Sequence, residues 1–293
     1  MRAPTVLKMY ATWRRAGVAL LLGLAVTLTG CSIRKLAYSW GTKLLVSRFA
    51  DTFDLNSSQK RDLLPRISAL HDWHRKTELP RYVEFLDQLI VKAQDGLDKN
   101  DVEWMLETSY PMIERLSARF SPEAAAVLAT CSDAQIDHAV AEFKKAEKER
   151  FEKLEQSEDE YIRHRVKVAK KNMKTWLGSY TDAQMQEYER YVRKTRVDET
   201  RRRKRYQENA QTLLATLRTH PGAAKISEIL HRWLTRQEVE PTPEFQAAEK
   251  RVQADFVDIV VTVDRMMSPE QRRHLINELK SWRSDFYELA NSN

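Results

Sequence analysis

The sequence has 293 residues, of which 49 are Lys or Arg and 42 are Asp or Glu, giving a formal net charge of +7. A basic chain can indicate a nucleic-acid partner, but residues 1–30 hold four basic and no acidic residues, which leaves 45 basic against 42 acidic residues in the remainder. Charge therefore gives no support to nucleic-acid binding. Only 7 residues are glycine, good helix formers are abundant, and no long stretch alternates apolar with polar residues, so the sequence predicts an all-α fold.

Residues 1–30 have the layout of a bacterial signal peptide. A basic stretch comes first, an apolar run follows, and Leu28, Thr29, Gly30 and Cys31 end the segment. The apolar run is too short to span a bilayer comfortably, because a spanning helix needs about 20 apolar residues. The tetrad resembles a bacterial lipobox, in which the cysteine thiol is alkylated with diacylglycerol and the chain is cut before the cysteine. The resemblance implies a cleaved signal peptide and a lipid on Cys31.

The residue after the cysteine bears on the membrane that holds the lipid. Lipoproteins retained at the inner membrane typically have Asp there, whereas this chain has Ser32, so the same resemblance favours the periplasmic face of the outer membrane. We expect residues 31–293 to form a periplasmic helical domain attached to the membrane through its N-terminal lipid, with a possible boundary near residues 120–132. Cys131 then has no cysteine partner for an intramolecular disulfide. An uncleaved anchor or an ordinary secretory signal is the alternative.

Four helix starts carry a capping signal in which Ser, Thr or Asn is followed three residues later by Gln. The four pairs are Asn56 and Gln59, Ser132 and Gln135, Thr181 and Gln184, and Ser268 and Gln271. Prolines at first helical positions and glycines after last ones mark further helix ends. Together these signals predict helices near residues 33–50, 57–78, 80–96, 100–118, 122–130, 133–177, 182–218, 223–237, 243–266 and 269–290.

The two longest of these helices, at 133–177 and 182–218, are joined by a short connection at Gly178. A short connection makes two helices antiparallel neighbours, so we predict a multi-helix bundle that contains a long helical hairpin. Residues equally distant from the connection should then face each other. This places the basic run Arg201–Arg205 opposite the acidic residues within 152–160.

We interpret these two charged runs as a ladder of ion pairs between the helices. Such pairs set the alignment of the helices more than their stability, because each surface pair contributes about 0–1 kcal/mol. The alternative is a binding patch for phosphate or anionic lipid that uses Arg201, Arg202 and Arg205.

The repeated cap followed by Gln resembles the LTxxQ motif of the small periplasmic stress chaperones of the Spy type. Those proteins are helical and cradle-shaped and bind unfolded clients. Leu55 and Gln59 match the ends of the motif, with Asn56 in place of Thr, while the other three caps lack the leucine. The resemblance implies a chaperone-like function.

A second resemblance covers nearly the whole chain. The sequence is similar to an uncharacterised family of proteobacterial helical lipoproteins, which supports the fold and the address and implies no active residue. The residues that carry the resemblance are the lipobox, Phe53-Asp54-Leu55 before Gln59, Trp73-His74-Arg75 with Glu78-Leu79-Pro80, and Arg201–Arg205.

Chemistry-bearing motifs are few. His71, His74 and Glu78 are spaced to share one face of a helix, and imidazole with carboxylate is a plausible zinc set, although the spacing is not that of a metalloprotease. There is no Gly-x-Ser-x-Gly and no glycine-rich phosphate loop. Cys131 lies just before a helix start, and we interpret it as a structural thiol. We therefore expect no cofactor.

We expect a non-enzymatic envelope protein that holds a protein or peptide client in a groove between long helices. Tryptophan and arginine present amphipathic contact surface. The candidate contacts are Trp73, His74, Arg75, Glu78, Arg201, Arg202 and Arg205. Two alternatives remain, namely an envelope enzyme or metal-binding protein around His71, His74 and Glu78, and a structural tether to peptidoglycan or lipid headgroups through the arginine run.

Overall fold

The computed structural model describes residues 31–151, 157–235 and 242–292, and every regular element in these ranges is helical. This confirms the all-α prediction. The helices are α2 (Cys31–Ser39), α3 (Gly41–Thr52), α4 (Ser57–Trp73), α5 (Leu79–Gln94), α6 (Lys99–Leu128), α7 (Asp133–Phe151), α8 (Glu158–Leu177), α9 (Asp182–Leu217), α10 (Ala223–Thr235), α11 (Pro243–Arg265) and α12 (Pro269–Asn291). A π-helical turn, η2 (His74–Glu78), joins α4 to α5.

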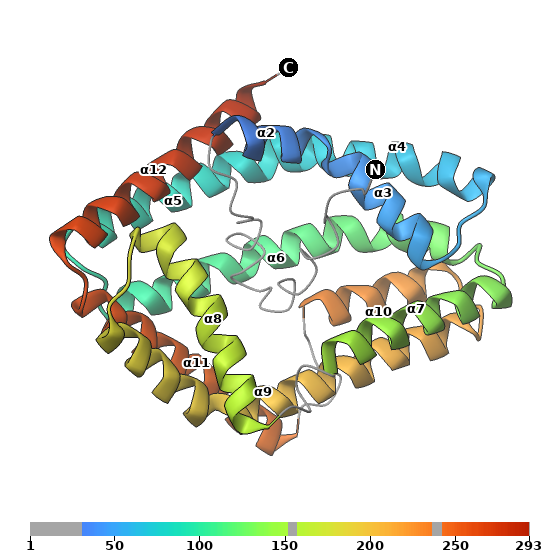
Figure 1. Cartoon of the computed structure of the whole chain (residues 1–293). Coiled ribbons are helices and arrows are strands. Elements are labelled where there is room, and N and C mark those ends of the chain that lie inside the picture. Colours follow the sequence, from blue (N-terminus) through green and yellow to red (C-terminus); the bar gives the residue numbers. More distant parts are fainter. Residues whose placement is uncertain (1–30, 152–156, 236–241, 293) are drawn as a thin grey trace, which may run out of the picture.

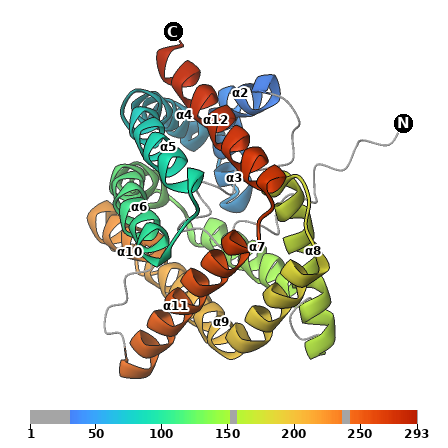
Figure 2. The ribbon, with the colours of Figure 1, turned by 90° about the vertical axis from the view of Figure 1, so that its left-hand side faces the viewer.

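The helices are arranged as an open, four-sided frame (Figure 1). α5 and α12 lie together along one side, and α9 and α11 along a second. α7, α10 and the end of α9 form the third side, and α2, α3 and α4 form the fourth. The view turned by 90° shows that α6 runs along one face of the frame and α8 along the opposite face (Figure 2).

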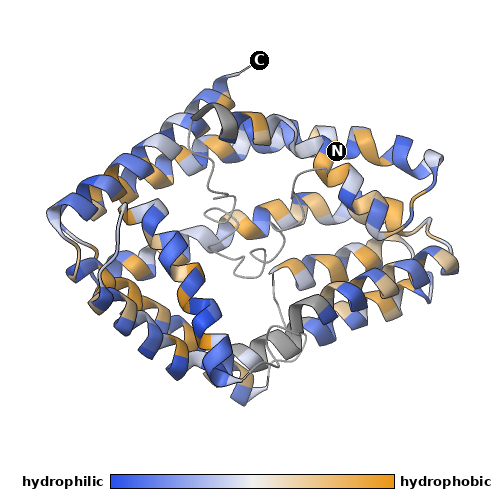
Figure 3. Cartoon of the chain, in the orientation of Figure 1, coloured by the Kyte–Doolittle hydropathy of each residue, from blue (hydrophilic) through white to orange (hydrophobic). Residues whose placement is uncertain are grey.

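Two hydrophobic cores lie at opposite ends of the frame. Core 1 joins α3, α4, α6, α7, α9 and α10, and its fully buried side chains include Leu63, Ile67, Ile136, Leu213 and Leu217. Core 2 joins α5, α6, α11 and α12, and its buried side chains include Leu79, Val102, Leu106, Val257 and Leu279. Removing these apolar surfaces from water is the main stabilising contribution to such helix contacts. Hydrophobic residues lie mainly where helices contact one another, and hydrophilic residues cover most of the outward faces (Figure 3).

The predicted helices 100–118 and 122–130 are one continuous helix, α6, and the prediction of a break was wrong. The sequence predicts Pro122 as the first residue of a new helix, but Pro122 lies inside α6. An interior proline removes one backbone hydrogen bond and costs about 3 kcal/mol. Burial of Ala124, Val127 and Leu128 in core 1, on the continuation of the same helix, offsets that cost. The possible boundary near 120–132 falls at the end of this helix and in the loop after it.

The predicted helix 133–177 is instead two helices, α7 and α8. Residues 152–156 are outside the described residues, and α8 starts with a capping box of its own. In this box the Ser157 hydroxyl accepts from the backbone N–H of Glu160, and the Glu160 carboxylate accepts from the backbone N–H of Ser157. The antiparallel hairpin therefore consists of α8 and α9 alone, while α7 packs against the far end of α9 and against α3.

Candidate functional site

The capping glutamines join loops that are far apart in the sequence. Gln59 caps α4 and also donates from Nε2 to the carbonyl of Thr130 (3.1 Å) and to Oε1 of Gln135 (3.1 Å). Gln135 donates back to Oε1 of Gln59 (2.7 Å) and to the carbonyl of Asp54 (2.8 Å). We call this reciprocal amide pair the N-terminal clasp. It fixes the α3–α4 loop against the α6–α7 loop.

The same geometry recurs in the second half of the chain. Gln184 donates to Oε1 of Gln271 (3.1 Å) and to the carbonyl of Met266 (3.4 Å). Gln271 donates back to Oε1 of Gln184 (3.0 Å) and to the carbonyl of Ser179 (3.2 Å). This C-terminal clasp fixes the α8–α9 loop against the α11–α12 loop. Each clasp carbonyl lies two residues before the cap of the opposing helix, so all four predicted caps have a second role that the sequence reasoning missed.

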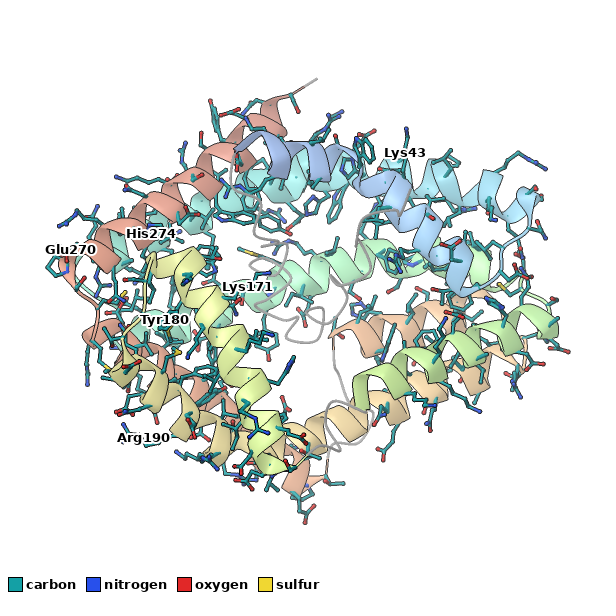
Figure 4. The ribbon with its side chains drawn as sticks, in the orientation of Figure 1. Lys43, Lys171, Tyr180, Arg190, Glu270 and His274 are labelled. Atoms are coloured by element: carbon teal, nitrogen blue, oxygen red, sulfur yellow. The ribbon has the colours of Figure 1, made fainter. Side chains whose placement is uncertain are left out.

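The connection after α8 is pressed against α12. Gly178 ends α8 in the left-handed region, with φ of 73°, and a Cβ there would lie 3.0 Å from Nδ1 of His274. Nε2 of His274 is 3.0 Å from the carbonyl of Thr175. His274 and Tyr180 are labelled beside this connection in Figure 4. These contacts hold the C-terminal end of α8 against α12.

The predicted histidine pair lies where α4 meets η2 and contacts Tyr38 of α2. The Tyr38 hydroxyl is hydrogen-bonded to Nδ1 of His74 (2.9 Å), and its carbonyl is hydrogen-bonded to Nε2 of His71 (3.2 Å). Burial lowers the pKa of His71, and burial together with the nearby His71 lowers the pKa of His74 to about 4. Both imidazoles therefore favour the neutral form.

Glu78 has no exposed surface and is held by two arginines. Arg115 donates from Nε and Nη2 to its carboxylate, each at 2.9 Å, and Arg81 donates from Nη1 at 2.9 Å. A buried carboxylate needs such partners, because an unpaired charge in the interior is costly. The carboxylate is thereby committed to these two arginines rather than to the histidines. Within the described residues, no three His, Cys, Asp or Glu side chains form a group that could hold a metal ion.

The remaining candidates near this turn are also partly or fully occupied. Trp73 is half-buried and packs against core 1, and Arg75 is half-buried and pairs with Asp72 at 3.2 Å. The segment Trp73 to Glu78 is therefore mainly a structural junction between α4 and α5.

The Cys131 thiol lies in the α6–α7 loop. Burial raises its pKa to about 11, which favours the unreactive protonated form.

Of the residues predicted to form the ion-pair ladder, the structure describes a pairing for Glu158. Glu158 of α8 accepts from Arg193 (3.2 Å) and Arg196 (2.8 Å) of α9. The prediction had placed Glu158 opposite the Arg201–Arg205 run, so its register was displaced by one to two helical turns. The side chains of Arg201, Arg202 and Arg205 lie outside the described residues, as do the predicted partners within 152–156.

A different basic surface is exposed on α8. No acidic residue occurs between Glu160 and the end of this helix. Five exposed cations lie on one side of this helix, and each is three or four residues from another, which places them side by side. They are Arg163, Lys167, Lys170, Lys171 and Lys174, and we call them the basic stripe.

The carboxylates of the described residues leave the basic stripe without an ion-pair partner. Within the described residues, the Tyr180 ring lies beside the stripe, with its centroid 5.7 Å from Nζ of Lys170. The opposite face of α8 buries Tyr161, Ile162 and Ala169. Figure 4 places Lys171 on the side of α8 that faces the middle of the frame. Counting charges along each face of the 133–177 segment would have found this surface.

A family model described as a family of unknown function, DUF6279, matches residues 51–239, which is more than half of the chain. The chain belongs to the DUF6279 family. The DUF6279 segment contains the N-terminal clasp and the basic stripe, whereas Gln271 and the Leu28–Cys31 tetrad lie outside it. Membership confirms the expected relation to an uncharacterised family. Comparisons with curated proteins and with solved structures found no match.

In the parts of the DUF6279 protein that the structure describes, none of the helices combines the length and the apolar character needed to cross a membrane.

Proposed function

We propose that this protein is a lipid-tethered envelope protein that holds acidic segments of polypeptide clients against the basic stripe of α8. The observation that carries the proposal is the stripe itself, in which five exposed cations follow one face of a helix and pair with no carboxylate of the described residues. They span twelve residues, which is a rise of about 16 Å along the helix. A row of like charges attracts an extended anionic chain, and the attraction weakens as salt screens it.

The stripe lies on a helix that is fixed in the fold, because α8 packs against α9 and α12. Long lysine side chains on a rigid helix can adapt to many sequences, because they recognise charge and not shape. This suits a chaperone-like protein with varied clients, in line with the resemblance of its caps to the LTxxQ motif.

The envelope address in this proposal rests on the lipobox. Expressing the full chain and analysing the mature N-terminal peptide by mass spectrometry tests it. We expect Cys31 to be the first residue and to carry diacylglycerol, and we expect Cys31→Ala to abolish this processing. An unmodified Cys31 within a longer peptide would contradict the lipid tether.

The client site is tested by charge reversal. Lys167→Glu combined with Lys171→Glu places two carboxylates in the middle of the stripe, whereas Lys250→Glu combined with Lys280→Glu changes the net charge equally at exposed positions of α11 and α12. We expect the stripe variant to bind an unfolded acidic polypeptide at least tenfold more weakly and to lose suppression of its aggregation. The control should stay within twofold. Equal effects of the two variants would refute the stripe as the client site.

A further inference from the structure

Exposed apolar side chains are concentrated on α2 and α3. Nine large hydrophobic side chains of the described residues are exposed, and four of them fall within ten positions of the chain. They are Leu36, Trp40, Leu44 and Leu45, with exposed fractions of 55, 64, 50 and 39%. We call them the apolar ridge. A tryptophan this exposed is unusual, because its large ring is strongly buried on average.

The ridge is held facing outward by firm contacts on the other side of α2. Arg34 donates to the buried carboxylate of Asp285 on α12 (2.5 Å), and its guanidinium lies 4.8 Å from the centre of the Trp282 ring. Lys35 pairs with Glu288, and Tyr38 reaches His74. α2 is thus attached to the frame by its polar face, and the apolar side chains of the ridge remain in solvent.

The charges around the ridge favour an anionic surface. Residues 31–50 contain four basic residues and no acidic one. Two of these, Lys43 and Arg48, are exposed on α3 beside the ridge, and Figure 4 shows Lys43 at the outer edge of the frame. Basic residues close to a bilayer are attracted to its anionic lipids.

The position of the ridge in the chain indicates what covers it. Cys31 is the first residue of α2, and Leu36 and Trp40 follow it by about 8 and 14 Å of helix. Lipid on Cys31 would therefore hold the ridge against the bilayer surface. Tryptophan is enriched at the membrane–water interface, where its ring is apolar and its N–H remains hydrated. A helical surface with apolar and basic residues lies in this interface without spanning the membrane.

We infer that the apolar ridge docks α2 and α3 on the membrane surface, with Trp40 in the headgroup layer of a bilayer that contains anionic phospholipid. The inference rests on the lipid tether of the proposed function. Docking of the ridge would give the protein a fixed orientation on the membrane, whereas a lipid tether alone would let the domain rotate freely.

Fluorescence quenching tests the depth of Trp40. The full chain is expressed, and the lipoprotein is purified and reconstituted into vesicles of phosphatidylethanolamine and phosphatidylglycerol with brominated acyl chains. We expect the brominated chains to quench wild-type fluorescence and the quenched part to fall at least twofold in Trp40→Phe. Trp104→Phe is the control, because Trp104 is stacked on Phe85 at core 2. Equal quenching in both variants, or none in the wild type, would overturn the inference.

Two further readouts separate this inference from the proposed function. If mass spectrometry finds Cys31 without lipid, the tether fails, and flotation of the unmodified protein with the same vesicles then tests the ridge alone. Flotation lost in Leu36→Ser combined with Leu44→Ser supports the ridge, and flotation equal to wild type overturns it. Loss of polypeptide binding in this double variant, with bromolipid quenching of the reconstituted lipoprotein unchanged, overturns membrane docking and makes the ridge a client surface.

Discussion

The two clasps have the same hydrogen bonds but different surroundings. Gln184 and Gln271 of the C-terminal clasp are 0 and 2% exposed, whereas Gln59 of the N-terminal clasp is 7% exposed and Gln135 is only half-buried. An amide that loses its partner in a dry interior bears the full cost of desolvation, while one near solvent recovers bonds to water. The sequence pattern thus specifies the geometry of a clasp, and burial determines how much that clasp contributes to the free energy of unfolding.

The largest effect on the free energy of unfolding is expected at the C-terminal clasp, which is the more buried of the two. Gln184→Ala should lower the free energy of unfolding by about 3 kcal/mol, because it removes a cap, deprives the buried Gln271 amide of its two bonds to Gln184 and creates a cavity. Urea unfolding followed by circular dichroism measures this change. A loss below about 1 kcal/mol would show that the burial of the C-terminal clasp adds nothing to its strength.

A change of pH should act on neither clasp, because amides do not titrate in this range. The low pKa of His74, about 4, means that the folded state binds this proton less tightly than the unfolded state does. The contribution of His74 to stability is full above pH 6.5 and is lost as the pH falls toward 4. Between about pH 7.5 and about pH 5 we expect a loss of about 2 kcal/mol.

Urea unfolding at these two pH values tests the role of His74. His74→Gln keeps a polar group facing Tyr38 but cannot titrate, so the variant should lose about 2 kcal/mol less than the wild type over the same interval. An unchanged pH dependence in His74→Gln would assign the titration to another group.

Substitution in the N-terminal clasp should destabilise the protein less than substitution in the C-terminal clasp. Gln135→Ala removes the same set of bonds as its counterparts in the C-terminal clasp, yet water can replace them, so we expect a loss of about 1 kcal/mol. A parallel urea titration with Gln271→Ala gives the comparison directly. Equal losses at the two positions would break the argument from burial.

The smallest effect is expected on the exposed surface of the α8–α9 hairpin. Glu158→Gln removes the ion pairs with Arg193 and Arg196, which are all partly or fully exposed, so the free energy of unfolding should fall by less than about 0.5 kcal/mol. Thermal unfolding at low and high salt measures this. A loss above about 1 kcal/mol would show that these ion pairs also stabilise the C-terminal clasp.

The fold class and most helix starts could be predicted because helix propensity and capping are local. The pairing of the caps could not, since each clasp joins glutamines 76 or 87 residues apart. The continuation of α6 through Pro122 depends on packing at core 1, which a local signal does not contain. The start of α8 could have been found, because Ser157 and Glu160 form the same kind of box as the four that were recognised.

The candidate site was less predictable than the fold. The segment around Glu78 was expected to meet a partner, but its role depends on Arg115, which lies 37 residues away in the sequence. The Arg201–Arg205 run drew attention because its charges are consecutive, although consecutive residues point around a helix. The basic stripe has its charges on one face and was missed for the opposite reason.

α6 gives the molecule a mechanical property. This helix of 30 residues is about 45 Å long and places side chains in both cores, with Val102 and Leu106 in one and Val127 and Leu128 in the other. Neither core can loosen without disturbing an element that the other also needs. The two cores should therefore unfold in a single cooperative step. A force applied at one core will be transmitted along α6 to the other.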